Sequence, residues 1–383
     1  MSWPLVKLGE VAPSKALKNP VVLSDDNVWQ LNLDMVESNS GRIINKLKAP
    51  LSEAGSSTHW FDERHVLYSK LRPYLNKVVL PDEQGLATTE LVPMLPDPEK
   101  LDRRYLVHYL RSKQFVSWIS DQVAGAKMPR VSMKIFWDHE IPLPPLAEQK
   151  RIAAILDKAD AIRQKRKQAI DLADEFLRSV FLDMFGDPVT NPKGWEVEKF
   201  GNVGSLDRGK SKHRPRNDPK LLGGLHPLVQ TGDVANSKGY LRSYTSTYSD
   251  FGLAQSKKWP AGTLCITIAA NIAKTGILTF DACFPDSVVG FTPNSKTTTE
   301  YVQAWISFLQ KILEANAPES AQKNINLAIL RDLDIPVPPV SQQKKFTMIV
   351  ENVNSVLNRT RASKESKEQL FNSLSQKAFS GQL

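Results

Sequence analysis

The chain contains an internal repeat that relates its two halves. The segment IPLPPLAEQKRI at residues 141–152 returns as IPVPPVSQQKKF at residues 335–346, with six of the twelve positions identical. The halves also begin alike, because WPLVKLGEV at residues 3–11 resembles WEVEKFGNV at residues 195–203. Self-similarity at a fixed period indicates a duplicated structural unit. We therefore expect two copies of one arrangement, each a globular domain followed by a long helix.

The segment after each Pro-Pro pair predicts that helix. Residues 147–185 and 341–379 contain neither Pro nor Gly, and the prolines before them favour an extended lead-in to a helix start. Helices of this length would extend roughly 55 Å, far beyond the usual length, so each needs a partner to pack against.

The spacing of apolar and small residues predicts that the two helices pair as a coiled coil. These residues alternate at intervals of three and four. The predicted seam comprises Ile152, Ile155, Ala159, Ile162, Arg166, Ala169, Ala173, Phe176 and Val180 in the first helix, and Phe346, Ile349, Val353, Val356, Thr360, Ser363, Lys367, Leu370 and Leu374 in the second. Both seams are apolar at the ends and small or polar in the middle, so parallel and antiparallel pairing match equally well. The pseudo-twofold relation of a duplicated unit favours antiparallel pairing, with Arg166 opposite Thr360 and Ser363.

We predict that the globular parts are α/β (α+β) domains with mostly antiparallel curved sheets, and that the two long helices join them. Short apolar or alternating runs bounded by turn residues predict strands at residues 65–68, 77–80, 263–268 and 277–280. Helical stretches are expected at residues 104–121 and 299–315. The predicted division is a first domain at 1–143, a helix at 144–187, a second domain at 188–337 and a second helix at 338–383.

The charge balance is compatible with a nucleic-acid partner. The chain has 50 basic and 41 acidic residues, a net charge of +9, which by itself also suits many proteins that bind no nucleic acid. The two cysteines form no metal-binding pattern and favour a reducing compartment. The start lacks signal-peptide features and no apolar run is long enough to cross a bilayer, so a cytoplasmic location is expected.

Polar and basic side chains gather in loops of both domains, and we interpret them as DNA-contacting candidates. In the first domain these are Ser69, Lys70, Arg72, Tyr74, Asn76 and Lys77, which follow an apolar strand. The second domain has Asn271 and Lys274 at the corresponding point, and an upstream basic segment with Arg208, Lys210, Lys212, Arg214 and Arg216. A third loop carries Lys127 and Arg130 in one copy and Lys323 and Asn324 in the other. One basic run alone would usually be a solvated loop, but basic loops at related places in both halves favour a binding surface. The domain interiors hardly match, as two different half-sites would require, although neutral drift would also produce this.

The chain resembles the specificity subunits of type I restriction-modification systems. The resemblance lies in the IPLPPLAEQKRI opening and the FLDMFGDP ending at residues 181–188, in residues 335–383, and in YSKLRPYLNKV at residues 68–78. One departure is Gln342, where the motif has Glu. The resemblance implies that the two domains are target recognition domains, each reading half of a split double-stranded DNA target through the major groove. The helices would set the gap between the halves.

The resemblance also implies partners and places the chemistry on them. Two methyltransferase subunits and two ATP-driven nuclease-translocase subunits would join this chain. S-adenosylmethionine, ATP and magnesium would bind those partners, so this chain would hold no cofactor and be non-catalytic by itself.

Catalytic motifs in the chain are weak. GSLDRGKS at residues 204–211 fits the phosphate-loop pattern, but two prolines and no apolar periodicity follow it, which argues against the helix that such a loop needs. We find no adenine-methyltransferase motif, and carboxylate pairs such as Asp171 and Asp174 read as a solvated helix face. Two rival hypotheses remain: a nucleotide-driven enzyme that uses residues 204–211, and a coiled-coil adaptor that does not bind DNA.

Overall fold

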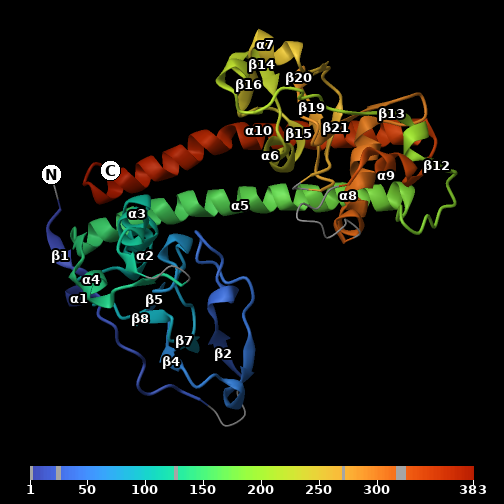
Figure 1. The fold of residues 1–383 in the computed structure, drawn as a ribbon. Helices are drawn as coiled ribbons and strands as arrows, with labels where there is room; N and C mark the ends of the chain where they lie inside the picture. Colours follow the sequence, from blue (N-terminus) through green and yellow to red (C-terminus); the bar gives the residue numbers. More distant parts are fainter. Residues whose placement is uncertain (1–2, 23–26, 125–127, 270–271, 316–324) are drawn as a thin grey trace. The chain divides into compact units, whose positions relative to one another are not determined.

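The computed structural model describes the chain except residues 1–2, 23–26, 125–127, 270–271 and 316–324, and it leaves out the side chains of residues 311, 314–315 and 359–370. The chain divides into two compact units (Figure 1). The first unit comprises Met1–Lys167 and Thr360–Leu383, and the second comprises Gln168–Arg359. Each unit therefore contains one globular domain and part of both long helices.

The two long helices are α5, Leu146–Phe185, and α10, Val340–Phe379, each of 40 residues. Each begins directly after a Pro-Pro pair, as predicted. Glycines in the left-handed conformation follow both helix ends, Gly186 with φ 80° and Gly381 with φ 74°. Because a residue with a Cβ is disfavoured in this conformation, glycine is the usual residue just beyond a helix end.

Contacts within each unit show that α5 and α10 run antiparallel. In the first unit the guanidinium of Arg151, near the start of α5, donates to the backbone oxygen of Leu383 at 3.0 Å. Farther along α5, Arg163 lies over the ring of Phe371, at 5.0 Å from the ring centroid. In the second unit Phe181, near the end of α5, packs edge-on against Phe346, near the start of α10. The predicted antiparallel pairing is confirmed.

The predicted register of the seam is wrong in the middle of the helices. Ile162 and Phe176 of α5 are 45% and 51% exposed, and Val356 of α10 is 65% exposed. Ile152 and Phe346, at the two helix starts, are buried as the seam predicts, whereas Leu156, Ile170 and Phe181 on α5 and Val350 and Leu357 on α10 are buried although they lie outside the predicted seam. An α-helix drifts by about 20° per heptad against a strict 3.5-residue repeat. A heptad frame extended over 40 residues therefore moves off the contact face.

The first unit is built from small, mostly antiparallel sheets. One sheet has the strand order β3-β2-β7-β4 and another the order β6-β5-β8. Among the described strands of this unit, β2 and β7 are the one pair that runs parallel. The helices α2 and α3 pack beside them (Figure 1). The elements are β1 Leu5–Lys7, α1 Leu8–Val11, β2 Asn27–Leu31, η1 Leu33–Met35, β3 Lys48–Pro50, η2 Leu51–Glu53, β4 Thr58–Phe61, β5 Val66–Ser69, η3 Pro73–Leu75, β6 Val78–Val79, β7 Gly85–Thr88, β8 Leu91–Met94, α2 Arg103–Arg111, α3 Lys113–Ser120, β9 Val123–Ala124, β10 Arg130–Val131, α4 Met133–Asp138 and β11 Glu140–Pro142.

The second unit follows the same plan with longer strands. Its sheets have the orders β13-β21-β18-β19-β15 and β16-β14-β20-β17. The elements are β12 Val197–Lys199, η4 Phe200–Asn202, β13 Gly204–Arg208, η5 Pro219–Leu221, β14 Leu222–Leu228, α6 Thr231–Asn236, β15 Gly239–Leu241, β16 Ser246–Tyr248, α7 Asp250–Ala254, β17 Lys258–Trp259, β18 Leu264–Thr267, β19 Thr275–Leu278, β20 Ala282–Cys283, β21 Val288–Pro293, α8 Thr299–Ala315, α9 Leu327–Asp332 and β22 Asp334–Pro336.

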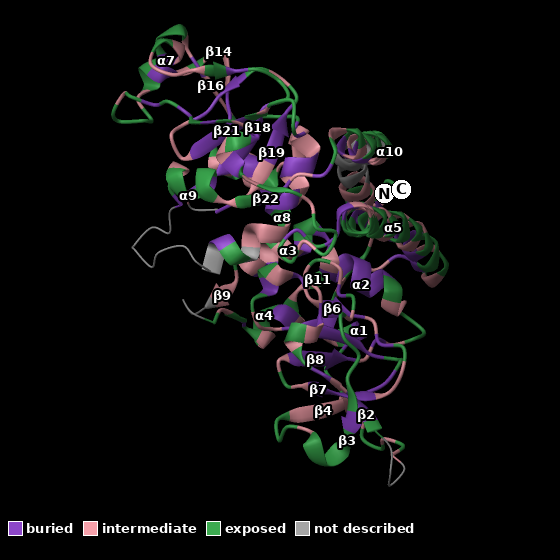
Figure 2. Ribbon diagram, turned by 90° about the vertical axis from the view of Figure 1, so that its right-hand side faces the viewer, coloured by how far each residue is buried: buried purple, intermediate pink, exposed green. Residues whose placement is uncertain are grey.

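Corresponding strands close both domains and confirm the duplication. β1 pairs with β11, and β12 pairs with β22, so the first strand of each domain is joined to the strand that leads into its long helix. Strand β18 (Figure 2) and its counterpart β5 in the first unit are buried along their whole length. The helical stretch expected at residues 104–121 is interrupted at Ser112, whose hydroxyl caps α3 by accepting from the Phe115 backbone N–H. The domain boundaries themselves stay a prediction.

Candidate nucleic-acid interface

In the first unit the loop after β5 is held in one conformation by its backbone. Arg72 and Asn76 flank η3, and both have φ of 50°, in the left-handed region. This conformation costs a residue with a side chain roughly 1–2 kcal/mol, so the surrounding contacts must stabilise it. The Arg72 N–H donates to the Pro129 oxygen at 2.8 Å, and the Val131 N–H donates to the Lys70 oxygen at 3.0 Å. The loop and strand β10 therefore form one connected surface.

Three of the predicted contact residues use their polar groups to bind backbone oxygens of the same unit. The Ser69 hydroxyl donates to the Leu71 oxygen at 2.8 Å, and the Asn76 amide donates to the Arg111 oxygen at 3.2 Å. The Lys77 ammonium donates to the Leu33 oxygen at 2.6 Å, and burial lowers the pKa of Lys77. These side chains shape the loop, and their contact with DNA stays a prediction.

Other predicted residues face outward from the same loop. Arg72 is exposed and Tyr74 is 50% exposed at the tip. Lys70 is half-buried and lines a pocket with His59 and Trp137. Among the described residues, Arg72 and Tyr74 are thus the side chains of this loop best placed to meet a large ligand.

Arg130 lies beside this loop and binds an acidic residue that the sequence analysis did not single out. Its Nη2 atom donates to Oε1 of Glu90 at 2.9 Å, and its Nε atom lies 3.3 Å from both carboxylate oxygens. The hydrogen bond and the charge of Glu90 raise the pKa of Arg130. Glu90 belongs to the turn between β7 and β8, and its backbone oxygen accepts from the Lys70 N–H.

In the second unit the basic side chains that begin at the last residue of β13 are exposed. Its predicted contact residues are Arg208, Lys210, Lys212, Arg214 and Arg216, and all five are exposed. The segment passes close to another part of the backbone at Gly209, where a Cβ would lie 2.2 Å from the Phe284 oxygen. Only glycine fits there without a shift, so Gly209 fixes where the basic segment leaves the sheet.

Asp286 binds the arginines of this segment. Its carboxylate lies 2.6 Å from Nη2 of Arg216 and 3.7 Å from Nη2 of Arg214. Its backbone oxygen accepts from Nε of Arg208 at 3.0 Å. The carboxylate and the backbone of one residue thus hold three arginines near one another.

Backbone contacts show which loops correspond in the two units. The Ser69 N–H donates to the Lys77 oxygen, and the Thr267 N–H donates to the Lys274 oxygen in the same way. Lys274 therefore occupies the place that Lys77 has in the first loop, and its contact with DNA stays a prediction.

The basic segment at 208–216 does not correspond to that loop. It begins at the end of β13, which pairs with β21, and in the first unit the isolated bridge Ser14–Met94 stands in the place of that strand pair. The expectation that the basic loops lie at related places in both halves is therefore wrong for this segment. The short sequence matches between the two halves could not reveal this lack of correspondence, because the flanking strands differ too much in sequence. Lys127, Asn271, Lys323 and Asn324 lie outside the described residues.

Each long helix is anchored to its domain by a buried glutamine. The Nε2 atom of Gln149 donates to the oxygens of Lys100 and Pro144 at 2.8 and 2.7 Å, and its Oε1 accepts from the Asp102 N–H at 2.8 Å. Gln343 makes the same three contacts in the second unit, with Lys296, Pro338 and Thr298. Both side chains are fully buried. Sequence reasoning gave them no role, although their identity in the two repeats was a signal.

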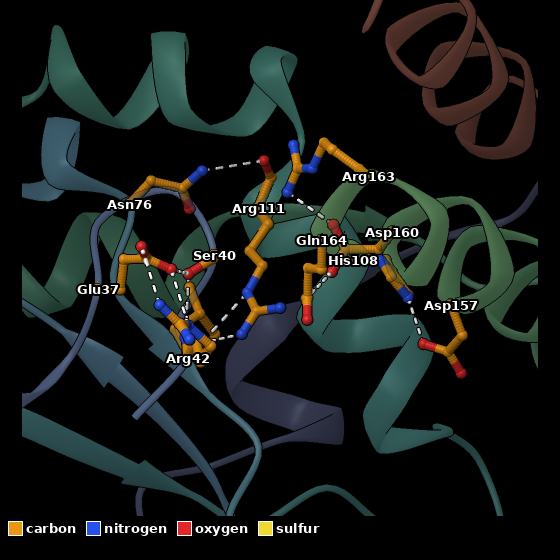
Figure 3. Close-up of polar contacts among 11 residues, drawn as sticks. Glu37, Ser40, Arg42, Asn76, His108, Arg111, Asp157, Asp160, Arg163 and Gln164 are labelled. Carbon is orange, nitrogen blue, oxygen red and sulfur yellow. Dashed lines mark hydrogen bonds and ion pairs between the residues drawn. The ribbon is translucent and has the colours of Figure 1, made fainter. Parts of the chain in front are cut away.

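Further polar contacts join α5 to the first domain (Figure 3). Nε2 of His108, on α2, lies 2.7 Å from Oδ1 of Asp157, and this contact lowers the pKa of Asp157. Glu37 binds Lys167, Ser40 and Arg42, which lower its pKa to about 2. The first half of α5 is therefore fixed to its domain by charged as well as apolar contacts.

The described residues lack the features that a metal cluster or a phosphate-binding loop would need. Among them no three His, Cys, Asp or Glu side chains could hold a metal ion together. Residues 204–208 form strand β13, and residues 209–218, all described, contain no helix. The phosphate-loop pattern therefore lacks the helix whose N-terminal amides would bind phosphate.

No described helix combines the length and apolar character needed to span a membrane.

Comparisons with known proteins agree in one family. A family model described as the type I restriction modification DNA specificity domain matches residues 61–172 and 192–370. The type I restriction enzyme EcoDI specificity subunit of Escherichia coli is 25% identical over 202 residues, 51% of this chain and 44% of that protein. The MjaVIII specificity subunit of Methanocaldococcus jannaschii is 24% identical over 74% of this chain and 71% of that protein.

A solved structure has a similar fold. The type I restriction-modification S subunit from M. genitalium superposes with a TM-score of 0.63 at 14% identity, covering 98% of this chain and 96% of that chain. At this identity the likeness concerns the fold alone, and it matches the plan of two mixed domains with long helices.

Proposed function

The chain belongs to the family of type I restriction-modification DNA specificity proteins, and from this premise we propose that it reads a two-part DNA target without breaking or forming bonds itself. The observation that carries the proposal is that the two units share one fold plan but expose different basic residues. The first unit offers Arg72, Tyr74 and Arg130, whereas the second offers the segment from Arg208 to Arg216. Two related domains with different contact residues suit two different half-sites.

The exposed cations would supply most of the affinity and little of the sequence preference. Lys and Arg contacts to phosphate position a protein on the duplex, whereas contacts to base edges specify sequence. Lys210 and Lys212 would bind phosphates, because an ammonium is a compact charge without the planar fork of arginine. Arg72 and Arg130 suit base edges or phosphates, since guanidinium binds both.

The helices would set the separation of the half-sites. Both α5 and α10 are continuous over 40 residues and each is shared by the two units. A helix transmits length at 1.5 Å per residue, and the glutamine anchors fix each helix start on its domain. In this proposal the paired helices are a spacer whose length sets the number of base pairs between the half-sites.

The chemistry of the system would come from partners. Two methyltransferase subunits and two nuclease-translocase subunits would assemble with this chain, and S-adenosylmethionine, ATP and magnesium would bind to them. Leu172 and Phe176 of α5 are 62% and 51% exposed, and such apolar side chains suit a methyltransferase docking on the helix.

A gel-shift experiment with the full-length chain and a duplex of random sequence tests DNA binding directly. We expect binding that weakens steeply as salt rises, with a linear fall of log affinity against log salt. No binding at low salt would favour the adaptor hypothesis. Hydrolysis of ATP by the purified chain, lost in Lys210→Ala, would favour the nucleotide-driven enzyme, which the absence of a helix in residues 209–218 argues against.

A further inference from the structure

Arg130 and Glu90 form a side-on pair that leaves one edge of the guanidinium toward solvent. The carboxylate takes the edge formed by Nε and Nη2, with Nη2 to Oε1 at 2.9 Å. Among the described residues, none accepts a hydrogen bond from Nη1 of Arg130. The Arg130 side chain is 47% exposed, so the edge formed by Nη1 and the second N–H of Nη2 is accessible.

The surroundings of this edge suit a DNA base. Leu71 and Arg130 form a backbone bridge, so the guanidinium emerges next to the rigid loop that presents Arg72 and Tyr74. Guanine offers two acceptors, O6 and N7, in the major groove, and an arginine edge with two parallel N–H groups binds both at once. A guanidinium already held by a carboxylate loses less conformational freedom when it binds, and it is less available to a phosphate.

We propose that Glu90 positions Arg130 to read a guanine in the half of the DNA target that the first unit contacts. The inference rests on the proposed function and adds a base identity and a positioning residue to it. Arg130 touches the base, and Glu90 acts through Arg130.

The second unit also has a carboxylate–arginine pair next to the corresponding turn. The Lys70 N–H donates to the Glu90 oxygen, and the Ile268 N–H donates to the Ser287 oxygen, so Glu90 corresponds to Ser287. Asp286 is the residue just before Ser287, and its carboxylate binds Nη2 of Arg216 at 2.6 Å. Both turns thus place a carboxylate against an arginine, although the two arginines come from different segments.

The experiment is a selection of bound duplexes from a library of randomised DNA by the full-length chain. The variants are Arg130→Lys, which keeps the charge but loses the fork, Glu90→Gln, and the double variant. Glu83→Gln is the matched control, because Glu83 pairs with Lys46 and Lys48 on the surface of the same unit and its change alters the net charge equally.

We expect the unaltered chain to select a guanine at one fixed position of one half-site. Arg130→Lys should reduce that preference by roughly 5- to 150-fold, the range of a good bidentate contact, and leave the other half-site unchanged. Glu90→Gln should weaken the preference at the same position, and the double variant should be no worse than Arg130→Lys. Glu83→Gln should select the original sequence.

Two results would overturn the inference alone: selection of a defined target that Arg130→Lys leaves intact, or a loss of preference in Glu90→Gln that spreads evenly over all positions of the target. If the unaltered chain selects no sequence at all, the proposed function fails as well. The outcomes therefore separate an error in the base assignment from an error in the function.

Discussion

Replacing Gln149 by Met should destabilise the first unit by about 3 kcal/mol. Gln149 is fully buried and makes three hydrogen bonds, two to the carbonyls of Lys100 and Pro144 and one from the Asp102 N–H. Each bond contributes about 1 kcal/mol net, and a buried backbone group left unpaired costs about 1–3 kcal/mol. Methionine has nearly the volume of glutamine, so a cavity adds little to this figure.

A second substitution at Gln149 separates the hydrogen bonds from the packing. Glu would keep the acceptor for the Asp102 N–H but would turn a second oxygen toward the two carbonyls that now receive the Nε2 protons. At neutral pH Gln149→Glu should therefore destabilise the unit at least as much as Gln149→Met. Gln343→Met should cause a similar loss in the second unit, because Gln343 makes the same three contacts.

Urea unfolding of the full-length chain, followed by far-UV circular dichroism, measures these losses. The two units need not unfold together, so the transition shifted by Gln149→Met should differ from that shifted by Gln343→Met. Lys150→Met is the control, because Lys150 is the exposed neighbour of Gln149 on α5. A loss below about 1 kcal/mol for Gln149→Met, or one equal to that of Lys150→Met, would refute the anchoring role of this glutamine.

Three further outcomes are expected. If Arg72 binds a phosphate, Arg72→Ala should reduce the slope of log affinity against log salt by about 0.9 in gel shifts, and an unchanged slope would exclude that contact. Four residues inserted after Arg166 add about 6 Å of helix, so the gap between the two half-sites should change by about two base pairs. A map of methylated adenines measures this gap, and an unaltered gap would refute the spacer role of the helices. The pKa of Glu37 is lowered from 4.5 to about 2, so its stabilising contribution is present above the unfolded value and lost as pH falls toward 2. Glu37→Gln should thus destabilise the chain near neutral pH and much less near pH 2 in urea unfolding, and equal losses at both would contradict the ion-pair assignment.

The long helices could be predicted from sequence because their signal is local. Absence of Pro and Gly over forty residues, together with the Pro-Pro lead-in, indicated both helices to within a residue or two. The contact face could not be predicted so well. Ile162 and Phe176 fit a heptad frame, but a straight helix rotates them away from the partner.

The candidate site was predictable as a region and not residue by residue. The loop after β5 was identified by its residue types, yet Ser69 and Asn76 use their polar groups to hold its backbone. Which side chain turns inward depends on tertiary contacts, such as the one between Asn76 and Arg111. The pairing of Arg130 with Glu90 joins residues forty positions apart, and no local pattern indicates it.

A map of methylated adenines in cells that express this chain together with a methyltransferase subunit of the same system tests the central claim most directly. If two unlike domains each read one half of the target, the methylated sequence should consist of two different specific parts with a gap of constant length. A single uninterrupted motif, a variable gap, or methylation that does not change when residues 188–337 are exchanged for those of another family member would contradict the account.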